Sequence, residues 1–432
     1  MRHAWGLGRG AVAAVVLVSY GLAVPAGSEA ATCTSYTSPE ATFTDGDCVV
    51  GSGKILLRGG TYRHHFNGET LHNAEVAQTT ASDGTKAIDK AGYLLTPDFE
   101  GEVLASASVD TAGRFDAQEL RYGLEDFGIE GKLYNAEVRV ERETGPYFYH
   151  LLTKQGYLSG PTFEGELSIT QTLNAEGGLE RLQETRYGIE DFGIQGKLYN
   201  AEVRIEREAG LYPYHSLTKE GYLYGPMFQG ELLVIQNLNT EGGLERLQER
   251  RYGTEDLGAE GKLYNTEQWV EQETGPYSYH LLTKHGYIQG PTFEGELRVT
   301  QTMTVEGNLE RLQELRYGTE DLGVEGKLYS AEVRIEREMS PDFYHIVEKH
   351  GYLEGPTFQG ELSMNLQLDE GGAVRYGEHV LDGTWRIDGQ EFFGQLRVIN
   401  NQGVIEVVDT RMSSQGSGSD PEPGPGDGSG GW

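Results

Sequence analysis

One motif recurs along the chain at a fixed interval. The string RYGLEDFGIEGKLYNAEV begins at Arg121, and close variants begin at Arg186, Arg251 and Arg316, 65 residues apart each time. Self-similarity at a fixed period indicates one architecture built from repeated pieces, so the length of 432 residues is a poor guide to the number of domains. The same 65-residue segment must therefore adopt the same structure several times in succession along the chain.

Each 65-residue repeat contains four runs of about a dozen residues separated by glycine-containing breaks, as expected for successive hairpins. Apolar and polar residues alternate within the runs at a period of two, which is typical of half-buried β-strands. The third run places on one face Phe163, Gly165, Leu167, Ile169 and Leu173. In the first run the same period predicts a shared face for Tyr134, Ala136, Val138 and Val140.

These patterns predict an all-β protein, an antiparallel β-hairpin repeat array over 56–370 that forms an open elongated sheet or solenoid. Five repeats of about 65 residues, with four strands each, start near Gly68, Gly131, Gly196, Gly261 and Gly326. After the fifth repeat the motif arrives six residues early, at Arg375. The sequence of a terminal repeat usually diverges, because one of its sides faces water and not a neighbouring repeat. Residues 371–411 are therefore predicted to be a divergent C-terminal cap.

The first 30 residues have the features of a signal peptide. Arg2 and Arg9 flank the start, an apolar stretch follows, and small residues provide a cleavage site after Ala30. The mature chain is therefore expected to be extracytoplasmic, that is secreted, periplasmic or at the cell surface. No later stretch approaches the roughly 20 apolar residues of a spanning helix, so no helical membrane anchor is expected.

The only two cysteines, Cys33 and Cys48, follow the predicted cleavage site closely. Export to an oxidising compartment predicts a disulfide between them, within an N-terminal cap over 31–55. At the other end, 412–432 is rich in Gly, Ser and Pro and is predicted to be a disordered tail.

The formal net charge is −32, with 67 acidic against 35 basic residues. Nucleic acids and anionic membranes are recognised by basic patches, so such a surface predicts that neither is a partner. The expected partner is a protein or a glycan at the cell surface.

No catalytic motif is present in the sequence. The D-F-G triplets at 126–128 and 191–193 lack the loop, lysine and catalytic motif of a kinase, and we interpret them as turns. The acid pair Glu190 and Asp191 is interpreted as part of a solvated turn, with calcium binding as the alternative. We therefore predict a protein that is not an enzyme and has no catalytic residue, no metal site and no cofactor other than that calcium.

Tyr-His pairs are the best candidates for binding residues. They recur every 65 residues, as Tyr149 and His150, Tyr214 and His215, Tyr279 and His280, and Tyr344 and His345. Equivalent residues of an open sheet lie roughly 19 Å apart, too far to share a metal ion. The hypothesis is a ladder of weak contact points for a sugar or a partner strand, and the alternative is a structural role in cross-strand pairs.

The segment DGTWRIDGQEFFGQL, 382–396, resembles a MORN-type repeat. Asp388 and Gly389 stand at the turn of such a hairpin, and Phe392, Gly394 and Leu396 in its second strand. The strings FEGE and FQGE, which recur in the third run of the repeats, are similar to the same strand. This partial resemblance implies an elongated antiparallel sheet used as a scaffold or contact surface.

The favoured function is that of a non-catalytic exported repeat protein, a scaffold or adhesin-like binding surface. One alternative is a closed β-propeller lectin that binds glycans, because a blade also contains four strands. Another is an outer-membrane β-barrel, because a signal peptide and alternating strands of about ten residues belong to that class.

Overall fold

A computed structural model describes most of the chain, namely 31–51, 53–65, 68–144, 148–209, 213–274, 279–304, 308–339 and 343–413. The predicted signal peptide and the tail from residue 414 onward lie outside the described residues. The chain forms two compact units. Unit 1 comprises the residues up to Pro226 and Glu231–Leu247, and unit 2 comprises Met227–Gly230 and the residues from Gln248 onward.

The secondary structure consists of β-strands and four short 3-10 helices. The strands of unit 1 are β1 (Ala31–Cys33), β2 (Tyr36–Thr37), β3 (Ala41–Thr44), β4 (Asp47–Gly51), β5 (Lys54–His64), β6 (Thr70–Thr80), β7 (Lys86–Leu95), β8 (Phe99–Val109), β9 (Phe115–Asp126), β10 (Lys132–Thr144), β11 (Tyr149–Ser159), β12 (Phe163–Leu173), β13 (Leu179–Asp191), β14 (Lys197–Glu208) and β15 (Tyr214–Tyr224). Both units contain residues of β16 (Phe228–Leu238) and β17 (Leu244–Asp256). The other strands of unit 2 are β18 (Lys262–Glu273), β19 (Tyr279–Gln289), β20 (Phe293–Met303), β21 (Leu309–Asp321), β22 (Lys327–Glu338), β23 (Tyr344–Glu354), β24 (Phe358–Leu368), β25 (Val374–Ile387), β26 (Gln390–Asn401), β27 (Val404–Asp409) and β28 (Met412–Ser413). The helices are η1 (Gly128–Glu130), η2 (Gly193–Gln195), η3 (Gly258–Glu260) and η4 (Gly323–Glu325).

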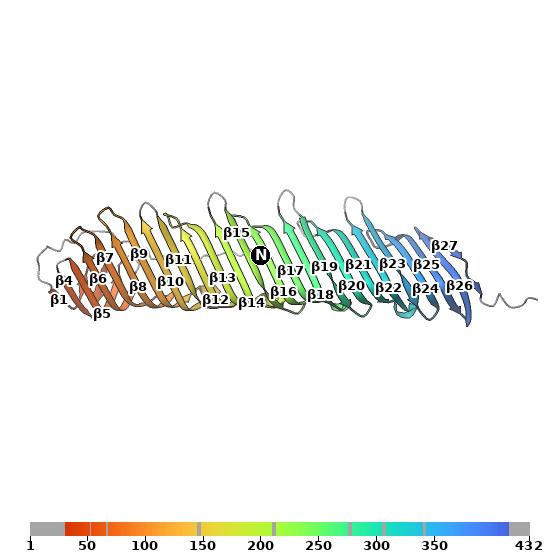
Figure 1. Ribbon diagram of the computed structural model, residues 1–432, viewed down its shortest axis with the longest axis horizontal. Coiled ribbons are helices and arrows are strands. Elements are labelled where there is room, and N and C mark those ends of the chain that lie inside the picture. Colours follow the sequence, from red (N-terminus) through yellow and green to blue (C-terminus); the bar gives the residue numbers. More distant parts are fainter. Residues whose placement is uncertain are drawn as a thin grey trace, which may run out of the picture. The chain divides into compact units, whose positions relative to one another are not determined.

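The predicted all-β, antiparallel hairpin architecture is confirmed. From β5 to β15 in unit 1 and from β18 to β27 in unit 2, each strand pairs antiparallel with the next along the chain. Within each unit the strands lie side by side in chain order (Figure 1). The strands β10, β14, β18 and β22 begin 65 residues apart, so four strands occupy each interval of the sequence repeat.

The sheet is continuous from one repeat to the next within a unit. The last strand of one repeat pairs with the first strand of the following one, as β13 does with β14 and β21 with β22. Propeller blades are separate sheets, so the alternative of a closed propeller is wrong. The outermost strands of each unit form no ladder with each other in the described residues, which contradicts closure of either unit.

Short strands pair along the N-terminal edge of unit 1. The two halves of β5 pair with β4 and β3 respectively, and β1 and β2 pair in turn with β4 and β3. Cys33 of β1 stands directly opposite Cys48 of β4, with their Cα atoms 4.8 Å apart, and the two sulfur atoms lie within disulfide-bonding distance. The cysteine pair therefore joins the outermost strand to the strand that covers β5.

Two tight hairpins end unit 2. Asp388 and Gly389, at φ 50° and 79°, connect β25 to β26, and Gln402 and Gly403, at φ 51° and 87°, connect β26 to β27. Positive φ at both central residues is the geometry that matches the twist of flanking strands. The D-G turn expected from the sequence is therefore present. Met412, which the sequence placed in the tail, belongs to β28 and pairs with β26.

A bulge interrupts the first strand of each repeat. In β10 the partner of Tyr134 is Tyr157 and the partner of Glu137 is Gln155, so β10 has one residue more than its neighbour over this interval. The pairing with β9 shifts at the same place. Asn135 takes φ 50°, a left-handed conformation that Asn tolerates better than most residues. The same conformation occurs at Asn73, Asn200, Asn265 and Ser330.

The bulge corrects one prediction about the faces of the sheet. Ala136 and Val138 are buried as expected, but Tyr134 is 46% exposed and does not share their face. An extra residue reverses which side of the sheet the preceding residues occupy. The third run follows the predicted alternation, since Phe163 and Leu167 are buried and the glutamates between them are exposed.

Two glycines recur in each repeat because they stand opposite each other on adjacent strands. Gly295 of FEGE stands opposite Gly318 of RYG across β20 and β21. A Cβ atom on Gly318 would lie 2.1 Å from the carbonyl oxygen of Glu294 and 2.7 Å from the Cα of Gly295. The two strands approach too closely for any side chain, and the same pairing links Gly165 to Gly188 in unit 1.

We predict that Gly318→Ala lowers the free energy of unfolding by about 1–3 kcal/mol, because the backbone of β20 must move to admit the methyl group. Gly371→Ala is the matched control, since its Cβ would meet only Asp369 Oδ1, at 3.3 Å, and its expected effect lies within about 0.5 kcal/mol. Urea denaturation of both variants measures the difference. Equal stability of the two would contradict the close approach of these strands.

Candidate functional site

Exposed tyrosines form a row across the strands on the face opposite the core. In unit 1 the tyrosine row comprises Tyr93, Tyr122, Tyr134, Tyr157, Tyr187, Tyr199 and Tyr222. In unit 2 it comprises Tyr252, Tyr264, Tyr287, Tyr317, Tyr329 and Tyr352. Their exposed fractions lie between 38% and 52%, which is unusual for so many aromatic residues on one face.

Strand register places a glutamate between tyrosines of this row. Tyr157 of β11 stands opposite Glu166 of β12, which stands opposite Tyr187 of β13. The same order, Tyr then Glu then Tyr, occurs at Glu102 on β8 and at Glu296 on β20. Adjacent strands are about 4.8 Å apart, so each carboxylate lies between two aromatic rings.

The glutamates between the tyrosines have no cationic partner. Across the stretches that the structure describes, no Lys, Arg or His forms an ion pair with Glu102, Glu166, Glu296 or the equivalent Glu361. Other glutamates of the same face hold the tyrosine hydroxyls. Tyr157 donates to Glu164 Oε1 at 3.1 Å, and Tyr287 donates to Glu294 Oε1 at 3.1 Å.

These hydrogen bonds fix the rings and affect their titration. The acceptor carboxylate raises the pKa of Tyr157 and of Tyr287, because the bond requires the neutral phenol, and burial and the negative charge add to the effect. Tyr93 has the same arrangement with Glu100, at 2.7 Å. The row therefore presents neutral, oriented aromatic rings next to unpaired carboxylates.

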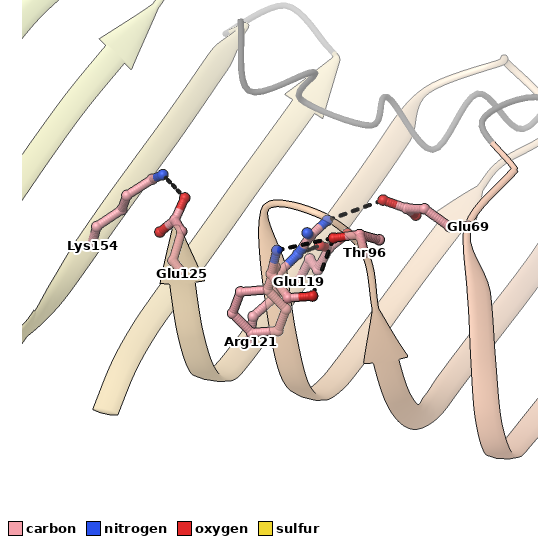
Figure 2. Close-up of polar contacts among 7 residues, drawn as sticks. Glu69, Thr96, Glu119, Arg121, Glu125 and Lys154 are labelled. Carbon is pink, nitrogen blue, oxygen red and sulfur yellow. Dashed lines mark hydrogen bonds and ion pairs between the residues drawn. The ribbon is translucent and has the colours of Figure 1, made fainter. Parts of the chain in front are cut away.

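On the opposite face a lysine and a glutamate form an ion pair in four of the repeats. Lys154 of β11 reaches across β10 to Glu125 of β9, and Figure 2 shows the two side chains pointing toward each other. The pair recurs as Lys219 with Glu190, Lys284 with Glu255 and Lys349 with Glu320. The side chains are 16% to 22% exposed, so the pairs are half-buried links across three strands.

Arginine, phenylalanine and glutamate of the repeat meet on this face. Arg121 lies between Glu119 and Glu69 (Figure 2), with its Nη2 3.7 Å from Glu69 Oε1. Its guanidinium carbon is 5.6 Å from the centre of the Phe99 ring. The same stacking joins Arg186 to Phe163 and Arg316 to Phe293. The Arg of RYG, the Phe of FEGE and the Glu of LQE thus have a structural role.

The D-F-G and D-L-G triplets form turns, as predicted. Asp126 Oδ1 accepts a hydrogen bond from the N–H of Gly128 at 2.7 Å, and Gly128 takes φ 66° at the start of η1. Asp191 makes the same contact with Gly193. The neighbouring Glu190 is the partner of Lys219. Both acids of this pair therefore contact groups of the protein itself.

The Tyr and the His of each predicted pair are consecutive residues of one strand. Consecutive residues of a strand point to opposite faces. His150 is 5% exposed, whereas Tyr214 of the next pair is 39% exposed. His215, Tyr279, His280, Tyr344 and His345 are half-buried, and the side chain of Tyr149 lies outside the described part. The alternative for them, a role in cross-strand pairs, fits the position of His150 opposite Arg142.

Burial lowers the pKa of His150, His215 and His345, and an arginine opposite each histidine lowers it further. We predict that the contribution of these histidines to the free energy of unfolding is constant above about pH 6.5. It decreases as the pH falls from there through their lowered pKa values. The unfolded chain takes up protons there, whereas the folded histidines resist them.

Thermal melts between about pH 7.5 and 5 measure this effect. The variant with His150→Gln and His215→Gln is expected to lose less melting temperature over that interval than the unsubstituted chain. An identical loss in both would show that these histidines do not contribute.

The tyrosine row was not predicted from the sequence. Tyr157 and Tyr187 could have been assigned to the exposed face, because they alternate with the buried Leu158 and with Gly188. Tyr134 could not, since its orientation depends on the bulge at Asn135. The sequence signal was the recurrence of Tyr in KLY, GYL and RYG at fixed positions of the repeat.

No group of three or more His, Cys, Asp or Glu side chains in the described stretches is arranged to hold a metal ion. The described part of the chain also contains no helix with the length and apolarity needed to cross a bilayer. Comparison with protein-family models, with curated proteins and with solved structures finds no match. The resemblance to MORN-type repeats stays a prediction.

Proposed function

We propose that the protein is a non-catalytic binding scaffold whose tyrosine row binds an extended, positively charged polypeptide. The observation that supports this most is the unpaired glutamate held between two exposed tyrosines, at Glu102, Glu166 and Glu296. Aromatic faces attract Lys and Arg side chains, and a carboxylate beside them adds a charge-assisted hydrogen bond.

The charge distribution favours a cationic partner over a neutral glycan. The net charge is −32, and four lysines of the core face, Lys154, Lys219, Lys284 and Lys349, are already paired with glutamates. The carboxylates of the row are not paired, and they face solvent. A basic polypeptide would neutralise them, whereas a glycan would stack on the rings and leave the charges uncompensated.

The periodicity favours an extended partner with several weak contacts. Four strands at about 4.8 Å separate Glu102 from Glu166, so equivalent sites within a unit recur roughly every 19 Å. Linked weak contacts raise the overall affinity without any single strong site. This proposal retains the adhesin-like scaffold expected from the sequence and moves its contact points from the Tyr-His pairs to the tyrosine row.

We propose an extracytoplasmic location for this activity. Residues 1–30 have the composition of a signal peptide, and the cysteine pair Cys33 and Cys48 fits an oxidising compartment. The partner is then a basic protein segment outside the cytoplasm.

Titration calorimetry with a lysine- and arginine-rich peptide tests the proposal. The variant Glu102→Gln, Glu166→Gln and Glu296→Gln is expected to bind about tenfold or more weakly, because each site contributes roughly 0.5–1 kcal/mol. The matched control is Glu176→Gln, Glu241→Gln and Glu370→Gln, which removes the same charge from exposed turns. The control is expected to retain most of the affinity.

Tyrosine variants test whether binding depends on the rings of the row. Tyr157→Ser should weaken binding, whereas Tyr214→Ser, at the far end of β15 from the row, should not. Equal losses in the triple-glutamate variant and its control would mean that binding depends on net charge alone, and equal losses in the two tyrosine variants would mean that the row is not the contact; either result would overturn the proposed site. Binding of a neutral β-glucan oligosaccharide, with no binding of the peptide, would overturn the partner class and favour a glycan as the partner of this open sheet.

A further inference from the structure

Strand β27 forms an apolar edge of unit 2. All six of its residues are exposed, and four of them are aliphatic, with exposed fractions of 72% for Val404, 67% for Ile405, 56% for Val407 and 40% for Val408. The strand pairs with β26 on one side. On its other side it pairs with no strand of the described chain.

The free side of β27 has a defined set of backbone groups. The two-residue turn at Gln402 and Gly403 makes Asn401 and Val404 the first hydrogen-bonded pair of the hairpin. Hydrogen-bonded and non-hydrogen-bonded pairs alternate in an antiparallel ladder. The N–H and C=O groups of Ile405, Val407 and Asp409 therefore point away from β26 and are available to another strand.

Proteins usually protect such edges with short strands, lysines, prolines or bulges. The N-terminal edge of unit 1 follows this rule, because it ends in β1 and β2, which have three and two residues. In contrast, β27 contains no lysine, no proline and no bulge. Its terminal acidic residue, Asp409, is already paired with Arg411.

We propose that β27 pairs antiparallel with β27 of a second copy, so that two chains form a symmetric dimer with Val407 on the two-fold axis. In this register Ile405 lies opposite Asp409 of the other copy, and Glu406 lies opposite Val408. The outward backbone groups of Ile405, Val407 and Asp409 then meet their counterparts directly. A self-complementary edge closes after two copies and cannot propagate into a fibre.

Neighbouring registers are less favourable. Residues that stand opposite each other in an antiparallel pair lie on the same face of the sheet. A two-fold axis perpendicular to the sheet must therefore pass between the two copies of one residue. Centring the pair on Glu406 would place two carboxylates directly opposite each other, which is destabilising. It would also bring together the backbone groups that already bond to β26. The register centred on Val407 avoids both problems.

The chain's own tail is a poor occupant of this edge. Residues 414–432 contain no Val, Ile or Thr and are rich in Gly and Pro. Proline cannot donate to a ladder, and glycine weakens a strand. A second copy of β27 offers the aliphatic, β-branched strand that the edge fits.

Sedimentation velocity over a range of concentrations tests the dimer on the full mature chain. We expect a reversible monomer to dimer transition that Val407→Lys shifts to at least tenfold higher concentration, because two lysines would meet on the axis. The matched control Leu104→Lys changes a residue that is 51% exposed elsewhere, and should leave the transition unchanged. Circular dichroism checks that both variants are folded.

A second variant locates the contact independently. Val407→Cys, treated with a short bismaleimide, is expected to give a cross-linked dimer, whereas Leu104→Cys is expected to remain monomeric under the same conditions. A protein that stays monomeric at every concentration, or a dimer that Val407→Lys leaves intact, would overturn the proposal. Val407→Cys that forms no cross-link in a sample that sediments as a dimer would also overturn it.

Discussion

One extra residue, held at a left-handed backbone angle, lies in the first strand of each repeat. In β10 it is Asn135, and the pairing of β10 with both neighbours shifts around it. Without the bulge, Tyr134 would share the buried face with Ala136 and Val138. With it, Tyr134 lies opposite Tyr157 on the exposed face. The tyrosines just before each bulge, namely Tyr134, Tyr199, Tyr264 and Tyr329, join the exposed row because of this local geometry.

The two faces of the sheet use the same residue types for different purposes. On the core face, the half-buried Glu125 is paired with Lys154, whose Nζ also lies 5.1 Å from the centre of the Phe127 ring. On the opposite face, Glu166 lies between Tyr157 and Tyr187 with no protein cation beside it. A cationic partner at Glu166 would reproduce on the outside the combination of ring, carboxylate and cation that already links the strands on the inside. This parallel is the physical basis of the proposed function.

Much of the fold followed from the sequence, because period-two alternation and glycine-rich breaks are local signals. The strands and the turn at Asp126 were predicted on that basis, whereas the pairing of Cys33 with Cys48 was predicted from the expected export of the chain. The proposed binding residues were not, because their placement depends on register between strands. Tyr214 and His215 are adjacent in the sequence and point to opposite faces, whereas Tyr157 and Glu166 are nine residues apart and stand opposite each other on neighbouring strands. Sequence spacing alone does not reveal which residues of neighbouring strands stand opposite each other.

The exposure of Tyr134 is the most direct test of this account, because it follows from the bulge and from no simpler pattern. Hydroxyl-radical footprinting with mass spectrometry reports the solvent contact of individual tyrosines. We expect Tyr134 and Tyr157 to be oxidised at similar rates, and Tyr62, which is 7% exposed, to be protected. Protection of Tyr134 to the same degree as Tyr62 would show that β10 follows plain alternation, and would contradict both the bulge and the place of Tyr134 in the row.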